Sequence, residues 1–96
     1  MSRYHAQVDA NQAEVVAQLR QIGASVQSIA TVGGGCPDLL VGYRGRTYTF
    51  EVKSGKAKLN DKEREWHRDW RGQVTTIYNA QEAMIVIGAV REVEKM

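Results

Sequence analysis

The segment from Asp38 to Lys53, DLLVGYRGRTYTFEVK, restricts the fold more than any other part of the chain. It consists of two strand-like runs, DLLVGY and RTYTFEVK, which meet at Arg44 and Gly45. Gly45 can adopt the positive φ angle that tight hairpin turns need, because glycine has no Cβ atom. The segment therefore predicts a β-hairpin with Arg44 and Gly45 as its two turn residues.

A two-residue turn also sets the register of this hairpin. Tyr43 then pairs with Arg46, and counting outward from that pair places Asp38 opposite Glu51. Because side chains alternate along a strand, one face collects Leu39, Val41, Tyr43, Tyr48, Phe50 and Val52. The other face collects Asp38, Leu40, Thr47, Thr49, Glu51 and Lys53. We expect the first face to build core and the second to gather charge at one end.

Two carboxylates in directly opposite positions repel each other unless a cation lies between them. A divalent ion such as Mg²⁺ suits that place, since it binds one or two carboxylates together with phosphate oxygens and water. Lys53 follows Glu51 by two residues, on the same face. Its ammonium group can bind a phosphate oxygen, or orient and help to deprotonate an attacking water. The alternative is a solvated strand end at which Lys53 pairs with Asp38 or Glu51.

The rest of the chain predicts helices and two more strands. Helical spacing of apolar residues predicts a first helix over 9–23, and β-branched residues predict a strand within 24–32, before a glycine loop at 33–35. Asn60 and Glu63 form the capping-box pattern of a second helix that ends near Arg71.

A fourth strand is predicted at 74–78 and a helix N-cap at Asn79. Residues 80–90 predict either a helix or a helix followed by a strand, and 91–96 are expected to fray. The order α-β-β-β-α-β-α over one domain, 1–96, predicts an α/β fold with a mixed central sheet flanked by helices.

Composition excludes several classes of protein. Thirteen Lys and Arg stand against eleven Asp and Glu, so a site for a polyanion requires local clustering. Cys36 is the single cysteine and cannot form an intramolecular disulfide, and it is too distant in sequence from His5 and His67 for a recognisable zinc site. No apolar run approaches the about 18 residues of a membrane span, no signal peptide is present, and SGKAK is not a Walker A loop. We therefore expect a cytoplasmic protein with no membrane contact and no nucleotide cofactor.

One further pattern joins the glycine loop to the hairpin. It consists of Gly35, Cys36, Pro37 and Asp38, then the hairpin, then Glu51, Val52 and Lys53. In this pattern the chain resembles the PD-(D/E)xK nuclease superfamily and, within it, the small VRR-NUC-type modules found in phages and in repair enzymes. The resemblance covers nearly the whole chain and implies a restriction-endonuclease-like core that binds Mg²⁺ or Mn²⁺.

The resemblance also implies roles for individual residues. The implied metal ligands are Asp38, Glu51 and the backbone carbonyl of Val52, with Lys53 as the catalytic lysine. In related enzymes the first helix supplies an acidic residue near the metal, and Glu14 is the matching position. Glu14 also stands three residues after Asn11, as in a capping box, so helix capping is the alternative. The chain departs from related modules at Glu63, where they often carry Gln.

Several cations lie just beyond the proposed site and are predicted to contact DNA phosphates. They are Lys56, Lys58, Lys62 and Arg64. Gly34 and Gly35 either let backbone N–H groups approach a phosphate or form a plain turn. Trp66 and Trp70 are four residues apart, and core packing on a buried helix face is favoured over base stacking. For His67, packing is favoured over a catalytic acid.

These observations predict a metal-dependent nuclease that hydrolyses phosphodiester bonds in DNA. Two alternative functions compete with this prediction. One rival is a catalytically silent nucleic-acid-binding module with the same fold, and the other is a structural domain with a solvent-facing charged face. We also expect a homodimer that acts on branched DNA, with the apolar segment 83–90 at its interface. A phage-encoded enzyme of this kind would act in the host cytoplasm.

Overall fold

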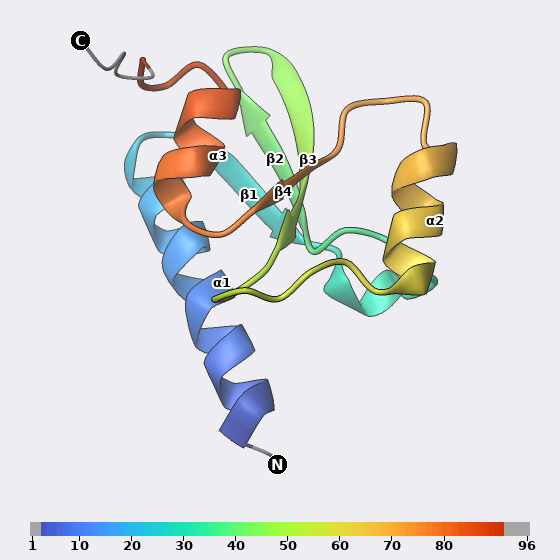
Figure 1. Cartoon of the computed structure of the whole chain (residues 1–96). Helices are drawn as coiled ribbons and strands as arrows, with labels where there is room; N and C mark the ends of the chain where they lie inside the picture. The colour runs from blue at the N-terminus through green and yellow to red at the C-terminus, as the bar shows by residue number, and fades with distance from the viewer. Residues whose placement is uncertain (1–2, 92–96) are drawn as a thin grey trace, which may run out of the picture.

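The computed structural model describes the backbone of residues 3–91 and the side chains of residues 10–91. Its elements are α1 (Arg3–Gln21), β1 (Ser25–Ser28), the 3-10 helix η1 (Ala30–Val32), β2 (Leu39–Tyr43), β3 (Arg46–Val52), α2 (Asp61–Asp69), β4 (Thr75–Ile77) and α3 (Ala80–Val86). The predicted order α-β-β-β-α-β-α is confirmed, with η1 as an addition (Figure 1).

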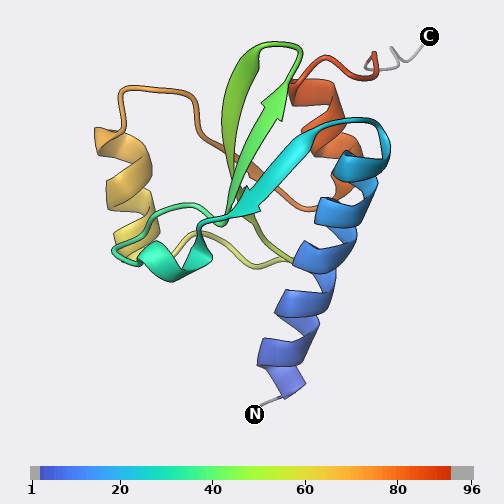
Figure 2. The ribbon, with the colours of Figure 1, turned by 180° about the vertical axis from the view of Figure 1, so that it is seen from behind.

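The four strands form one mixed sheet in the order β1-β2-β3-β4. The β1–β2 and β2–β3 pairs are antiparallel, and the β3–β4 pair is parallel. Helices α1 and α3 lie together on one side of the sheet, and α2 lies on the other side (Figures 1 and 2). The predicted fold class, an α/β domain with a mixed sheet flanked by helices, is confirmed.

The hairpin has the predicted turn and register. Arg44 and Gly45 have φ angles of 51° and 80°, and Tyr43 pairs with Arg46. Positive φ at both turn residues matches the right-handed twist of the two strands. The Arg44 guanidinium lies 5.1 Å from the centre of the Tyr43 ring, a cation–π contact at the turn. The paired register ends at Leu39 and Phe50, and the Asp38 N–H also donates to the Phe50 carbonyl, so Asp38 lies beside the end of the ladder rather than in the predicted regular pair with Glu51.

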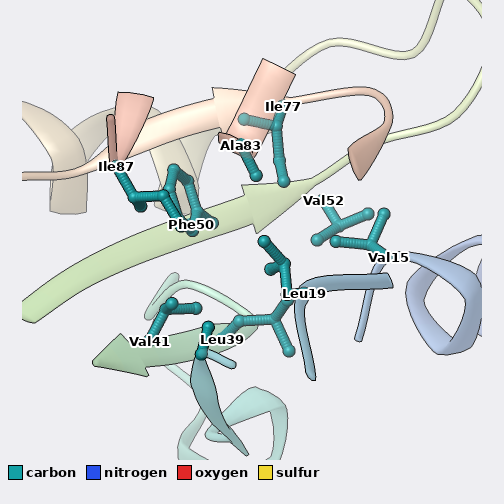
Figure 3. Packing of buried hydrophobic residues seen from close by; sticks show 10 residues of the cluster. Val15, Leu19, Leu39, Val41, Phe50, Val52, Ile77, Ala83 and Ile87 are labelled. Carbon is teal, nitrogen blue, oxygen red and sulfur yellow. The ribbon is translucent and has the colours of Figure 1, made fainter. Parts of the chain in front are cut away.

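The core lies between the sheet and the α1–α3 pair (Figure 3). Its buried side chains are Val15, Leu19, Ala24, Leu39, Val41, Phe50, Val52, Ile77, Ala83 and Ile87. Tyr43 and Tyr48 pack half-buried at its edge. The predicted apolar face of the hairpin is therefore the core face.

Helix α1 begins at Arg3, six residues before the predicted start, and ends as predicted before Gly23. Gly23 has a φ of 95°, its N–H donates to the Arg20 carbonyl, and the Ala24 N–H donates to the Leu19 carbonyl. This is a Schellman motif, which ends a helix at a glycine. Because Asn11 lies in the middle of α1, the capping box proposed for Asn11 and Glu14 is wrong.

Two predicted segments differ in their details. The strand predicted within 24–32 is shorter, because its pairing with β2 ends where Ser28 meets Leu39, and η1 follows. Residues 80–90 form helix α3 and a turn at Gly88, with no strand as far as Arg91. The fraying predicted at the C-terminus concerns residues 92–96, which lie outside the described range. Within the part of the chain that the structure describes, no helix is long and apolar enough to cross a membrane.

Helix α2 differs most from the prediction. Its capping box is confirmed, since Asn60 Oδ1 accepts from the Glu63 N–H at 2.8 Å and Glu63 Oε1 accepts from the Asn60 N–H at 2.9 Å. No residue of α2 is buried, however, and Trp70, its C-cap, is 46% exposed. The prediction that Trp66 and Trp70 share a buried face is therefore wrong. The core on the other side of the sheet is complete without them.

Candidate active site

A cavity of about 180 Å³ opens where β3 ends and the chain leaves toward α2. Its lining residues are Asp38, Glu51, Val52, Lys53, Ser54, Ala57 and Glu63. The predicted acidic pair and its lysine are thus brought together. Residues from the start of β2, the end of β3 and the first turn of α2 meet here, although they are up to 25 positions apart in the sequence.

Asp38 is held by three hydrogen bonds around the start of β2. Its N–H donates to the Phe50 carbonyl at 3.0 Å, and its own carbonyl accepts from the Ile29 N–H at 2.8 Å. The carboxylate oxygen Oδ2 accepts from the Val52 N–H at 2.8 Å. The backbone of β3 therefore fixes the Asp38 carboxylate beside Glu51.

Glu51 is almost fully buried, with 3% of its surface exposed. Its Oε1 atom has no hydrogen-bond partner among the described residues, and Oε2 lies 3.6 Å from Lys53 Nζ. Burial, and then the neighbouring Asp38 carboxyl group, raise the pKa of Glu51 to about 9, against the opposing effect of Lys53. A buried carboxylate with an unpartnered oxygen is costly, so this arrangement favours a bound cation or a proton.

Lys53 lies between two carboxylates, with its Nζ atom 2.8 Å from Glu63 Oε1. Burial lowers the pKa of Lys53, but the hydrogen bond that Lys53 donates to Glu63 and the charges of Glu51, Glu63 and Asp38 outweigh it and raise the pKa above its usual value. Burial likewise raises the pKa of Glu63, and the hydrogen bonds from Lys53 and the Asn60 backbone outweigh it, so that pKa is lowered. Lys53 is therefore an ammonium group at neutral pH, paired with an ionised Glu63.

The donor set of the cavity fits Mg²⁺ or Mn²⁺ better than a structural zinc ion. Two adjacent carboxylates, an unpartnered Glu51 Oε1 and an unpartnered Ser54 Oγ supply hard oxygen donors. Among the described residues, no group of three His, Cys, Asp or Glu side chains is placed to hold a metal. A closed zinc site needs about four such ligands. An ion held by two carboxylates would keep positions open for water and phosphate.

The first helix reaches the site through Asn11. Glu14, the acidic residue implied by the resemblance, is exposed, accepts a hydrogen bond from Gln18 Nε2 at 3.1 Å, and does not line the cavity. Asn11 Nδ2 instead donates to the Lys53 carbonyl at 3.0 Å. Asn11 stands four residues before Val15 and eight before Leu19, both buried, so helical spacing already places it on the face toward the sheet.

Glu63, like Asn11, contacts the site although the sequence pattern predicted no such contact. Its capping-box position was visible in the sequence, but capping alone predicts no contact with Lys53. The contact arises because the chain from 53 to 60 folds back and brings the first turn of α2 to the end of β3. Tyr78 helps to hold this segment, since its hydroxyl donates to the Ala57 carbonyl at 2.7 Å.

The four predicted phosphate contacts are exposed around the cavity but are not equivalent. Lys56 and Lys58 flank Ala57, which lines the cavity, and Lys62 lies in the first turn of α2. The Arg64 guanidinium donates to the Leu59 carbonyl at 3.0 Å and pairs with Asp61, so it is engaged in holding the start of the helix. Lys56 and Lys58 are thus the best placed to meet a polyanion.

Gly34 and Gly35 both have positive φ angles, 66° and 87°. A Cβ atom at Gly35 would lie 2.3 Å from the carbonyl oxygen of Lys62. The glycine is therefore required by the close approach of this loop to the first turn of α2, independently of any phosphate. His67 is half-buried with its Nε2 atom unpartnered among the described residues, and burial lowers its pKa. It does not line the cavity.

Comparison with known proteins identifies the architecture. Neither a protein-family model nor a curated protein sequence matches this chain. A solved structure described as "VRR_NUC domain" superposes on 84% of this chain and 94% of its own, with a TM-score of 0.68 and 23% sequence identity. The chain has the fold of a VRR_NUC domain. This is the fold that the glycine loop, the hairpin and the Glu51-Val52-Lys53 run had led us to expect.

Proposed function

We propose that this VRR_NUC-fold protein is a Mg²⁺- or Mn²⁺-dependent nuclease that hydrolyses phosphodiester bonds in DNA. The observation that carries the proposal is the buried Glu51, with one unpartnered oxygen, beside Asp38 and within 3.6 Å of the Lys53 ammonium. A buried carboxyl group with an unpartnered oxygen makes the free energy of folding of a small domain less favourable. A bound cation would partner these carboxylate oxygens, which accounts for the presence of a destabilising cluster at this position.

In this mechanism Asp38, Glu51 and the Val52 carbonyl hold the cation. A cation held there would supply Lewis-acid chemistry, making water more acidic and offsetting the negative charge of the phosphoryl oxygens. Lys53 donates a hydrogen bond to a phosphate oxygen or to the attacking water, and its raised pKa favours this orienting role over proton removal. Glu63 fixes the ammonium group, and Asn11 fixes the backbone from which it extends.

We also propose how many chains form the active protein and which form of DNA it cuts. A domain of this size offers little surface for recognition, so we propose a homodimer that cuts branched DNA inside the cytoplasm, the host's if the protein is phage-encoded. Segment 83–90 stays the proposed interface, but it offers only part of its apolar side chains, because Ala83 and Ile87 are buried in the core whereas Val86 is 37% exposed. Light scattering tests the assembly, and a mass near 10.7 kDa for the free protein, together with a DNA complex that holds a single protein chain, would rule the dimer out.

A cleavage panel tests the proposed activity. Labelled linear, flapped and four-way DNA substrates are incubated with the protein and Mg²⁺, Mn²⁺ or EDTA. We expect cleavage with either ion and none with EDTA. Retention of DNA without cleavage under any condition would instead identify a silent binding module, and neither retention nor cleavage would identify a structural domain.

We predict that Lys56 and Lys58 act on affinity more than on cleavage, because phosphate contacts position DNA without touching the reacting bond. Replacing both by Ala should weaken binding and make the dependence of log affinity on log salt shallower by roughly one ion per lost contact. A matched variant, Arg44→Gly with Arg46→Ala, removes the same charge at the far end of the hairpin and should leave the slope unchanged. Equal slopes in both variants would place the two lysines in solvent.

We also predict that Asn11→Ala impairs cleavage and Glu14→Ala does not. Loss of the Asn11 hydrogen bond frees the Lys53 carbonyl, and a small displacement of the lysine is expected to lower the rate by roughly tenfold. Among the described residues, Glu14 makes a side-chain hydrogen bond with Gln18 and does not line the cavity, so its removal should leave cleavage unchanged. The opposite outcome, with Glu14→Ala inactive, would restore the role implied by the resemblance.

A further inference from the structure

Trp66 and Trp70 form an ordered aromatic stack on the outer side of the molecule. Their ring centres are 4.5 Å apart, and the ring planes differ by 21°. Helix α2, which carries them, lies across the sheet from α1 and α3 (Figure 2). Trp70 is 46% exposed, which is unusual for a residue type that is mostly buried in folded proteins. The pair therefore leaves a large aromatic surface open to solvent.

The exposed ring is held in place rather than free to rotate. Trp70 Nε1 donates to the Gln73 carbonyl at 3.2 Å, and the same carbonyl accepts from Thr49 Oγ1 at 2.6 Å. Thr49 belongs to β3, so this network ties the ring to the central sheet. A Cβ atom at Gly72 would lie 2.8 Å from Trp70 Nε1, so glycine there leaves room for the ring. A fixed, exposed ring loses little conformational entropy when a ligand stacks on it.

A shallow cavity of about 210 Å³ lies beside the two rings and borders the glycine loop. It is lined by Gly34, Glu65, Trp66, Asp69 and Trp70. The Asp69 carboxylate is paired with the Arg68 guanidinium at 3.0 Å, and the Glu65 carboxylate can accept hydrogen bonds from the amino groups of nucleobases. The proposed contacts with DNA phosphates lie elsewhere, at Lys56 and Lys58. The aromatic rings and the Glu65 carboxylate therefore suit a nucleobase.

The cavity and the candidate active site are separate, but helix α2 contributes residues to both. Glu63, which pairs with Lys53, lies one helical turn before Trp66. From Glu63 to Trp70 the helix rises by about 10 Å, at roughly 1.5 Å per residue. Gly34 lies four residues before Asp38 in the chain. A strand held at the acidic pair can therefore reach the rings within a few nucleotides.

We propose that Trp66 and Trp70 form a stacking platform for an unpaired nucleobase of the substrate strand. The choice of nucleic acid as the ligand rests on the proposed function. A paired base is already stacked between its neighbours, whereas an unpaired base has a free face that an aromatic ring can cover. The platform would direct the enzyme to single-stranded, flapped or branched regions beside the bond to be cut.

Binding without metal tests the platform separately from cleavage. Trp66 and Trp70 are the two tryptophans of the chain, so tryptophan emission reports on this stack alone. In EDTA, a single-stranded oligonucleotide should quench the emission, whereas an abasic oligonucleotide of equal length and a long duplex should not. Equal quenching by the abasic oligonucleotide would overturn the platform, because it carries the same phosphates without bases. Absence of quenching by the base-bearing strand would do so too.

Affinity measurements on variants complete the test. Trp70→Ala should weaken binding of the base-bearing strand by roughly 5- to 150-fold, the range of base–aromatic stacking, and leave abasic binding unchanged. Trp70→Phe should retain most of the affinity, and Val86→Ala, at another exposed apolar residue, should retain all of it. An unchanged ratio of base-bearing to abasic affinity in Trp70→Ala would refute the platform. Quenching without cleavage by the wild type would refute the proposed activity and leave the platform standing.

Discussion

Asp38→Asn, Glu51→Gln and Lys53→Ala should each reduce metal-dependent cleavage by on the order of a thousandfold or more, because each removes part of the charge arrangement around the reacting phosphate. Their effects on metal binding should differ. Asp38→Asn and Glu51→Gln each replace a hard anionic ligand by a neutral amide and should weaken Mn²⁺ binding. Lys53→Ala removes a cation near the ion and should leave Mn²⁺ bound. Calorimetric titration with Mn²⁺, together with cleavage rates, separates the two classes.

The matched control is Asp61→Asn, which neutralises an exposed carboxylate of α2 outside both the acidic cavity and the cavity beside the tryptophans. It should retain both cleavage and Mn²⁺ binding. Asn at position 38 keeps an oxygen that can accept from the Val52 N–H, so the fold is expected to survive the substitution. Wild-type cleavage by Asp38→Asn or by Glu51→Gln would refute the assignment of the site.

Glu51→Gln should make the metal-free protein more stable while abolishing its activity. The variant keeps the shape of the side chain but removes a carboxyl group that has one unpartnered oxygen and must take up a proton to be buried beside Asp38. Lys53 keeps its partner Glu63 at 2.8 Å. A gain of about 1 kcal/mol would raise the melting temperature by roughly 4 to 8 °C in a domain of this size. Thermal unfolding in EDTA measures the difference.

The dependence of that difference on pH follows from the raised pKa of Glu51. The unfolded chain releases the Glu51 proton near pH 4.5 and the folded chain near pH 9, so between these values the folded state binds more protons. The contribution of Glu51 to stability is therefore fully present below pH 4.5 and is lost as the pH rises through about 9. The advantage of the Gln variant should grow over this window. A constant or shrinking difference would contradict a buried, perturbed Glu51.

The features that the sequence alone determined are those that depend on neighbours in the chain. The hairpin register follows from a two-residue turn at Arg44 and Gly45, and alternation then decides which side chains face the core. The end of α1 at Gly23 and the caps at Asn60 and Asn79 depend on the conformations and hydrogen bonds of one helical turn. Asp38, Glu51 and Lys53 meet for the same reason, since one hairpin carries all three.

Only the tertiary structure decided which elements cover which face of the sheet. Trp66 and Trp70 have the spacing of a buried face, but α1 and α3 already complete the core, and α2 packs on the opposite side through Gly35 and Lys53. Helical periodicity shows which residues share a face and does not show what that face meets. The contacts of Asn11 and Glu63 with Lys53 join segments far apart in the chain. Their formation depends on the packing of whole elements, which no short pattern in the sequence encodes.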